Sequence, residues 1–404
     1  MVPKKIGILY LFTGIGHYRE SYSIRSALKK YLPSVEVDLI SPISILKKRS
    51  SFRSKIAHGI YQLVVNVTLF FNRSPKGFIA TDNRLKDLVI EKSFKFIFSV
   101  VRYVEGLASK RFMEICEVGK YDLIISTHPI ASGLLFGFPK HKYWNICPDE
   151  VSIATAEFYR IPNYTNLVNS DSVRNQILKL SSVRERLSET LVVGHPLDPL
   201  ILSKKEKIFK RIQSEFSLGK VEIGLFIGGF GPKFQKKSII DVIQKLADFV
   251  KESNIIIHVI TGNHLDFERR LDDVIEQYKL SKYIKVYRTR SKRELVEVGH
   301  RLIEKHINVM FSRPSELVFY SMGVGMPHIM FDPLGPQEVD MYNLLNTTAG
   351  CPFYREIKSD LCEVISDKTE LLKMSRKLYE SGYNLNGSEN VAKLVKSYYE
   401  DISK

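Results

Sequence analysis

Short apolar runs and longer amphipathic stretches alternate along almost the whole chain. Most runs are rich in β-branched or other apolar residues, as expected for strands buried on both faces of a parallel sheet. Strands are expected at residues 5–12, 35–40, 121–127, 142–146, 191–194, 221–227, 255–260, 284–287, 307–311 and 328–331. Helical periodicity lies between them, at residues 21–31, 235–251, 267–280 and 292–305. The alternation predicts an α/β fold with doubly wound parallel sheets.

A domain boundary is expected at residues 194–219. There a strand ends in GHPLDPL, a charged helical stretch follows, and a new strand begins a second series of strand–helix units. The length of 404 residues also suits more than one domain. We therefore expect two Rossmann-like domains that face each other across a cleft, over residues 1–200 and 201–404. The last helix is a candidate for packing back on the first domain.

The net charge of +16 is concentrated near the N-terminus, where residues 1–100 hold 17 Lys and Arg against 6 Asp and Glu. Two apolar stretches, residues 56–71 and 94–108, are flanked by Lys and Arg and are shorter than the ~20 residues that span a bilayer. They favour an amphipathic surface within residues 45–111 that docks on an anionic membrane. Two core helices with solvated charged faces remain the alternative. Nucleic acid is not expected as a partner, since the chain has no RNA-binding signature.

The four cysteines show neither CxxC nor metal-ligand spacing, so neither a disulfide scaffold nor a metal site is expected. The apolar start of the chain ends in a Gly/His turn and not in a small-residue cleavage site, so it is interpreted as a first strand. We expect a cytoplasmic protein without a cofactor, attached peripherally to the cytoplasmic face of a membrane.

The first glycine turn, TGIGH, follows the first expected strand and contains Gly14, Gly16 and His17. Glycines in such a turn let a ligand approach the backbone closely, and the following helix start favours anions. His17 at this point could take a proton from an attacking hydroxyl, or it could only hydrogen-bond the backbone. The spacing is not the G-x-G-x-x-G fingerprint, so no nicotinamide dehydrogenase is implied.

The second glycine turn, GGFGP, follows the strand expected at 221–227 and contains Gly228, Gly229 and Gly231. Free backbone N–H groups there could hold a diphosphate, helped by the lysines that follow. A plain tight turn is the alternative.

A third region follows the strands expected at 307–311 and 328–331. It contains Ser315 and Glu316 in one loop and Gln337 and Glu338 in another, and hydrogen-bonding groups of this kind suit sugar hydroxyls. A run of helix caps and turns is the alternative, since Ser315 could be only an N-cap.

The order of these motifs resembles that of a group of GT-B glycosyltransferases: MurG, monogalactosyldiacylglycerol synthase and the processive diacylglycerol glycosyltransferases. The matching segments are TGIGH at 13–17, STHPIASG at 126–133, GHPLDP at 194–199, GGFGP at 228–232, TGN at 261–263, GVGMP at 323–327 and GPQE at 335–338. The resemblance implies transfer of a sugar from a nucleotide-diphosphate donor, expected to be a UDP-sugar, to a lipid or lipid-linked acceptor.

The resemblance also implies residue roles. His17 would lie near the acceptor and the donor phosphates, and His128 and Pro129 would line the acceptor side. The donor would be held by the two glycine turns together with Tyr287, Ser315, Glu316, Gln337 and Glu338.

GT-B enzymes usually stabilise the leaving diphosphate without a metal, which suits a chain that lacks a DxD motif. The favoured scheme is direct displacement with His17 as base, and Asp149 is the second candidate, although a loop aspartate more often only caps a turn. The chain departs from the family pattern at Tyr320, where the family has a ribose-binding glutamate, and at Asp198, where it has an arginine.

Two other functions remain open. One is a nucleotide-sugar 2-epimerase-like enzyme, against which the basic and apolar segment argues. The other is a catalytically degenerate GT-B binding or scaffold protein, which the two departures favour.

Overall fold

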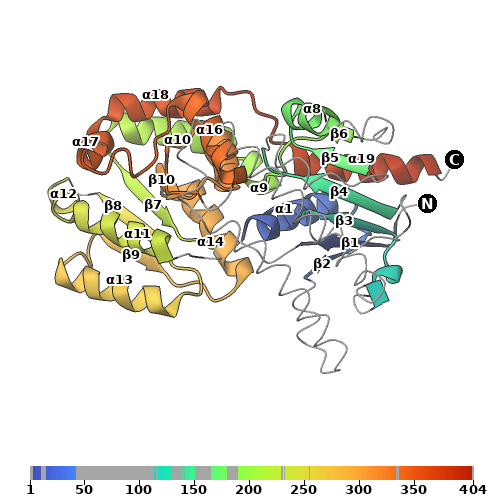
Figure 1. The fold of residues 1–404 in the computed structure, drawn as a ribbon, viewed down its shortest axis with the longest axis horizontal. Helices are drawn as coiled ribbons and strands as arrows, with labels where there is room; N and C mark the ends of the chain where they lie inside the picture. Colours follow the sequence, from blue (N-terminus) through green and yellow to red (C-terminus); the bar gives the residue numbers. More distant parts are fainter. Residues whose placement is uncertain are drawn as a thin grey trace, which may run out of the picture.

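A computed structural model describes residues 3–10, 15–41, 113–114, 117–128, 139, 142–150, 165–179, 190–228, 231, 233–253, 255–333 and 336–402. The two apolar stretches at 56–71 and 94–108, and the candidate residues Gly14, Pro129 and Gly229, lie outside these ranges. The described elements form two lobes, each built around its own sheet (Figure 1).

The N-terminal lobe holds a parallel sheet of six strands in the order β2-β1-β3-β4-β5-β6. Its strands are β1 (Lys5–Leu9), β2 (Glu36–Ile40), β3 (Leu123–Ser126), β4 (Tyr143–Cys147), β5 (Thr165–Val168) and β6 (Thr190–Val192). Sequence analysis missed β5, because polar residues interrupt its apolar pattern. Buried Asn145 on β4 donates through Nδ2 to Oδ1 of Asn166 on β5, at 3.2 Å, so this polar pair is satisfied inside the sheet.

The C-terminal lobe holds a parallel sheet of five strands in the order β11-β10-β7-β8-β9. Its strands are β7 (Glu222–Phe226), β8 (Ile256–Ile260), β9 (Ile284–Tyr287), β10 (Val309–Ser312) and β11 (His328–Met330). Most side chains of these strands are buried, which agrees with their apolar sequences. The predicted pair of doubly wound parallel sheets is therefore confirmed.

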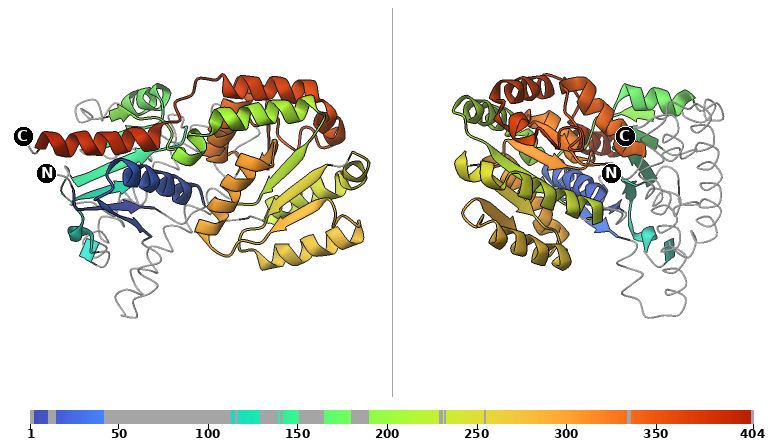
Figure 2. Two further views of the ribbon diagram at one scale, coloured as in Figure 1. Left: turned by 180° about the vertical axis from the view of Figure 1, so that it is seen from behind. Right: turned by 60° about the vertical axis from the view of Figure 1, so that its left-hand side comes forward.

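Helices cover both faces of the sheets. They are α1 (Gly16–Tyr31), α8 (Asp171–Lys179), α9 (Pro199–Leu202), α10 (Lys205–Ser217), α11 (Lys233–Lys245), α12 (Ala247–Glu252), α13 (Leu265–Gln277), α14 (Lys292–Lys305), α15 (Leu317–Val324), α16 (Pro336–Ala349), α17 (Leu361–Ser366), α18 (Lys368–Tyr379) and α19 (Gly387–Ile402), with a 3-10 turn at Val118–Lys120. In the C-terminal lobe, α10, α16 and α18 lie on one face and α11 and α13 on the other (Figures 1 and 2). The helix expected at 235–251 is divided into α11 and α12 at buried Leu246.

The last helix returns to the N-terminal lobe. Helix α19 packs along α1, and its Val391 and Val395 share a core with Ile6 and Ile8 of β1. Both chain ends therefore lie at the same end of the molecule (Figure 2). The N-terminal lobe thus consists of two segments of the chain that are far apart in sequence.

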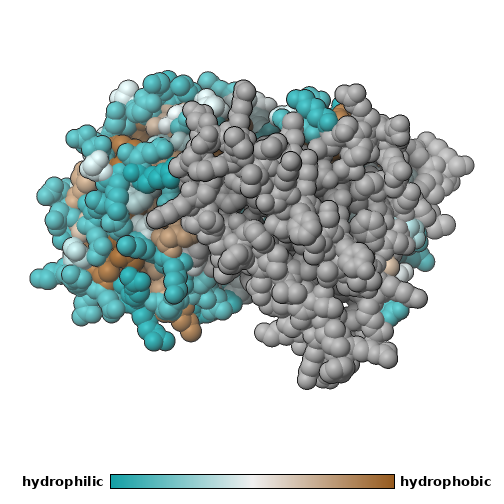
Figure 3. Space-filling view, viewed as in Figure 1, coloured by the Kyte–Doolittle hydropathy of each residue, from teal (hydrophilic) through white to brown (hydrophobic). Residues whose placement is uncertain are grey.

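The side of the C-terminal lobe seen in Figure 3 is mostly hydrophilic, with small apolar patches. None of the helices in the described part of the chain has the length and apolar character needed to cross a membrane.

Candidate functional site

The first turn of α1 lies beside the carboxyl ends of β3 and β4. Nδ1 of His17 lies 3.1 Å from Oε2 of Glu20, one helical turn later, and the His17 ring stands edge-on to the ring of His128, with centroids 4.4 Å apart. The hydroxyl of Thr127 donates to the backbone carbonyl of His17 at 3.3 Å and so fixes α1 against the end of β3. The fold thus brings His17 and His128 together and adds Glu20, which sequence analysis missed.

Burial and charge change the protonation of this group. Burial alone lowers the pKa of His17, but the charge and hydrogen bond of Glu20 outweigh it, and the pKa rises to about 9. Burial raises the pKa of Glu20 to about 7, against the opposing effect of His17. The charge of buried Asp149 raises both pKa values, so this carboxylate lies close to the pair. Burial and the His17 charge keep His128 neutral by lowering its pKa.

The contact with Glu20 bears on the expected chemistry of His17, whose role as the base stays a prediction. Sequence analysis made it a base because the unperturbed pKa of histidine lies near neutrality. A pKa raised to about 9 by Glu20 favours the protonated form of the imidazole at neutral pH. Glu20 is the member of the pair whose pKa lies near neutrality.

A buried ion pair joins the two lobes next to this group. Nη1 of Arg19 on α1 donates to Oε1 of Glu316, which precedes α15, and the two side chains are only 4% and 6% exposed. The Glu316 carboxylate also lies against Gly16, since a Cβ on that glycine would come within 2.7 Å of Oε2. Glu316 was expected to bind the donor, but its carboxylate is already engaged across the domain interface.

The two departures from the family pattern belong to the same interface. The ring of Tyr320 packs on the Arg19 guanidinium, 5.6 Å from the ring centroid, and its hydroxyl lies 3.0 Å from Nε2 of His300. Asp198 caps α9 by accepting from the N–H of Leu200 at 2.8 Å. In this chain Tyr320 therefore contacts the other domain, and Asp198 caps a helix.

A lysine makes a second contact between the lobes. Nζ of Lys292, at the start of α14, lies 4.9 Å from the ring centroid of Tyr10 and 5.7 Å from that of Tyr18. Burial lowers the pKa of this lysine to about 8. Tyr10 follows β1 and Lys292 follows β9, so the carboxyl ends of the two sheets face each other.

Two glycines of the turn after β7 have a left-handed backbone conformation. Gly228 and Gly231 have φ of +70° and +46°, and a Cβ on Gly228 would meet no atom within 4 Å. His264 lies in front of this turn, where a Cβ on Gly231 would come within 2.4 Å of its Nε2. This Nε2 is buried and has no hydrogen-bond partner among the described residues. Sequence analysis missed His264, although it directly follows the TGN segment.

Burial, followed by the charge of Lys236, lowers the pKa of His264, and a hydrogen bond with the backbone of Gly228 partly opposes this effect. Lys236 is paired with Asp266, with 2.8 Å between Nζ and Oδ2. His264 therefore lies between the glycine turn and Lys236 of α11.

Other expected donor residues are already bonded within the protein. Glu338 accepts from Nη1 of Arg313 at 2.8 Å, and the Tyr287 hydroxyl lies 3.0 Å from Nδ1 of His258. Ser315 lies in the loop before α15, and Gln337 is in the first turn of α16. Donor binding by these four predicted residues stays a prediction.

Neither a protein-family model nor a curated protein matches the sequence. Solved structures match over nearly the whole chain. MurG from Acinetobacter baumannii is 13% identical, with a TM-score of 0.51, and the match covers 98% of this chain and 100% of that one. UDP-GlcNAc 2-epimerase from Neisseria meningitidis, bound to UDP-GlcNAc, is 14% identical, with a TM-score of 0.50 and 99% of each chain covered.

At these identities the similarity establishes the fold. The chain has the two-domain GT-B architecture, as its motifs predicted. Membership of the MurG and diacylglycerol glycosyltransferase group stays a prediction, because enzymes of two different activities share this fold with similar scores.

Proposed function

We propose that this chain is a glycosyltransferase that moves a sugar from a nucleotide-diphosphate donor, expected to be a UDP-sugar, to a lipid or lipid-linked acceptor. One observation carries the proposal: the carboxyl ends of the two sheets face each other, with a group of titratable side chains on one side and a glycine turn on the other. In open α/β sheets, ligands bind at the carboxyl ends of the strands.

The glycine turn after β7 is the proposed site of the donor diphosphate. Its positive-φ glycines and the start of α11 offer backbone N–H groups, and the helix dipole favours negative charge at the same point. His264 lies directly beside this turn, where a Cβ on Gly231 would come within 2.4 Å of its Nε2.

The pair of His17 and Glu20 is the proposed proton-handling group. In a direct displacement, the acceptor oxygen bonds to the anomeric carbon as the bond from that carbon to the diphosphate oxygen breaks, and the electron pair leaves with the nucleotide. The acceptor proton passes to this pair, in which His17 is the predicted base and Glu20 is the carboxylate 3.1 Å from its Nδ1. Asp149 remains the alternative acceptor of the proton.

The membrane-associated acceptor is proposed from the sequence of residues 45–111, which lie entirely outside the described part of the chain. Their basic residues and short apolar runs suit the surface of an anionic bilayer.

The test is a transfer assay with UDP-glucose, UDP-galactose and UDP-N-acetylglucosamine, using vesicles that contain diacylglycerol or a polyprenyl-linked sugar as acceptor. Release of UDP together with a glycosylated lipid, identified by mass spectrometry, is expected. Glu20→Gln should lower turnover by on the order of 100- to 10,000-fold. The matched control Glu206→Gln, on the exposed face of α10, should keep full activity.

The same samples distinguish the alternatives. If the donor sugar is converted to its 2-epimer and no glycosylated lipid forms, the chain is an epimerase and not a transferase. Donor binding without either product would indicate a binding protein.

A further inference from the structure

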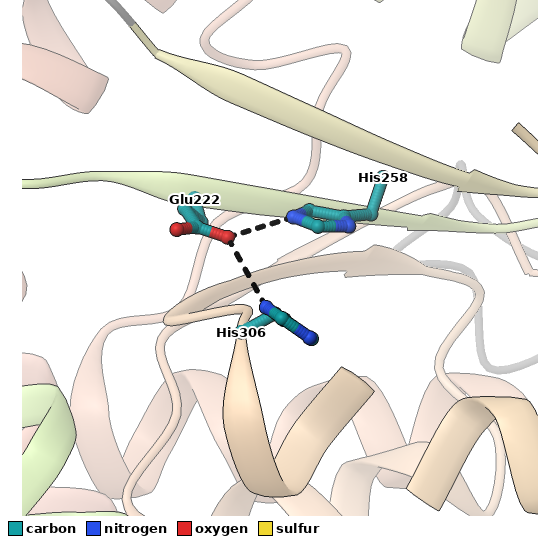
Figure 4. Close-up of side chains that lie close together, drawn as sticks. All are labelled: Glu222, His258 and His306. Atoms are coloured by element: carbon teal, nitrogen blue, oxygen red, sulfur yellow. Dashed lines mark hydrogen bonds and ion pairs between the residues drawn. The ribbon is translucent and has the colours of Figure 1, made fainter. Parts of the chain in front are cut away.

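A second polar cluster lies at the opposite end of the C-terminal sheet from the glycine turn. It consists of Glu222, the first residue of β7, His258 on β8 and His306 directly after α14 (Figure 4). Among the described residues, this is the one group of at least three His, Cys, Asp or Glu whose ligand atoms converge, all within 4.8 Å of one another. The proposed transfer reaction makes no use of it.

The three side chains share Oε2 of Glu222 as their centre. This oxygen lies 2.7 Å from Nε2 of His258 and 3.9 Å from Nδ1 of His306. Ligands of a tetrahedral Zn²⁺ ion lie roughly 3.3 Å apart, given metal–ligand bonds of about 2.0–2.2 Å. The observed spacings lie on either side of this value, so rotation of the His306 side chain could complete a site.

The surroundings hold the ligands as a metal site requires. The hydroxyl of Tyr287 lies 3.0 Å from Nδ1 of His258, which leaves Nε2 of that ring to face the cluster. Lys220 pairs with the other carboxylate oxygen of Glu222, with 2.7 Å between Nζ and Oε1. Such outer contacts orient ligands and fix the histidine tautomer.

Backbone contacts fix the third ligand while its side chain stays accessible. The carbonyl of His306 accepts from Nη1 of Arg211 at 3.0 Å, and its N–H donates to Leu302. The His306 side chain is 41% exposed, whereas His258 is fully buried. An ion could therefore enter from the His306 side and keep a water in its fourth position.

We propose that Glu222, His258 and His306 bind one divalent transition-metal ion, with Zn²⁺ as the fitting species. Two nitrogen ligands and one oxygen ligand suit Zn²⁺ better than Ca²⁺ or Mg²⁺, which prefer oxygen alone. A bound ion would tie β7 and β8 to the turn after α14. Its role would be separate from sugar transfer at the other end of the sheet, and it would revise the expectation of no metal.

The test uses the full chain after removal of metals with a chelator. Titration with Co²⁺ should give the visible d–d absorption of a tetrahedral site with N and O ligands, saturating at one equivalent, and Zn²⁺ should abolish that absorption by displacement. Zn²⁺ should also raise the melting temperature, because an ion that binds only the folded state stabilises it.

Three variants make the result specific. His306→Ala should abolish the absorption and the Zn²⁺ shift, while its melting temperature without metal stays near that of the parent. Tyr287→Phe should weaken binding about 10- to 100-fold, because it removes the contact that orients His258. Lys305→Ala, next to His306 but exposed, should bind as the parent does. An unchanged absorption in His306→Ala, or no absorption in the parent, would overturn the proposal.

Discussion

The ion pair between Arg19 and Glu316 should be a principal tie between the two domains. Arg19 lies on α1 of the N-terminal lobe and Glu316 before α15 of the C-terminal lobe, and both are almost fully buried. Replacing Glu316 with Gln leaves the Arg19 charge buried without its counter-charge. The ring of Tyr320 offers only a partial substitute.

The expected loss of folding stability follows from the burial of both partners. Breaking a buried ion pair by removing one partner typically costs about 3–5 kcal/mol, because the remaining charge loses its compensation. Glu316→Gln and Arg19→Met should each approach this range. The double variant leaves no isolated charge, so it should be more stable than the sum of the single effects implies, with a coupling energy of about 1–3 kcal/mol.

The assay is urea unfolding followed by the fluorescence of Trp144, the only tryptophan in the sequence. Trp144 packs against Tyr398 of α19, with ring centroids 5.6 Å apart, and therefore reports on the N-terminal lobe. Glu206→Gln, which breaks the exposed pair with Lys210, is the matched control and should not move the transition. The reasoning would be refuted if Glu316→Gln and Arg19→Met were as stable as this control, or if the double variant lost the sum of their two effects.

Three further predictions concern protonation and membrane binding. Glu20→Gln should lower the pKa of His17 from about 9, because Glu20 makes the largest contributions that raise it. A proton NMR titration that still gives about 9 would contradict the pairing. The stability that comes from the raised pKa of His17 is present below pH 6.5 and is lost as pH rises through about 9. Burial lowers the pKa of His328 to about 3, so the free energy of unfolding should fall by up to about 1.4 kcal/mol per pH unit below pH 6.5 because of this residue. In His328→Gln, the free energy of unfolding measured with urea should therefore depend less steeply on pH. Binding to anionic vesicles through residues 45–111 should weaken with salt in a sedimentation assay, and equal binding to neutral vesicles would count against it.

Much of the fold could be predicted because its strands and helices carry local signals. Strand β9 and helix α14 have the predicted bounds, and Ser291 caps α14 by accepting from the N–H of Glu294 at 3.1 Å. Strand β5 was missed because Asn166 is buried through a partner on the neighbouring strand. That partner, Asn145, is 21 residues away, so no local pattern reveals the pair.

The candidate site was predictable only in part, for the same reason. The glycine turns and His17 are visible in the sequence as strand–turn–helix motifs. Glu20 looks like a solvated helical residue, and its burial comes from the ends of β3 and β4, more than 100 residues later. The engagement of Glu316 by Arg19 likewise depends on a contact between residues 297 positions apart.

The central claim is that the donor diphosphate binds at the glycine turn after β7, and matched variants of two glycines test it. Gly228 follows β7 and Gly219 precedes it. Both have positive φ, +70° for Gly228 and +74° for Gly219, and a Cβ on either would meet no atom within 4 Å. Valine at either position should cost a similar strain of about 1–3 kcal/mol. Only at Gly228 would the side chain fill the proposed diphosphate site.

The decisive measurement is calorimetric titration of the parent, Gly228→Val and Gly219→Val with UDP. The account predicts binding by the parent and by Gly219→Val, and an affinity at least about tenfold lower in a folded Gly228→Val, equivalent to about 1.4 kcal/mol or more. Equal UDP affinity in the two variants, or no UDP binding by the parent, would contradict it.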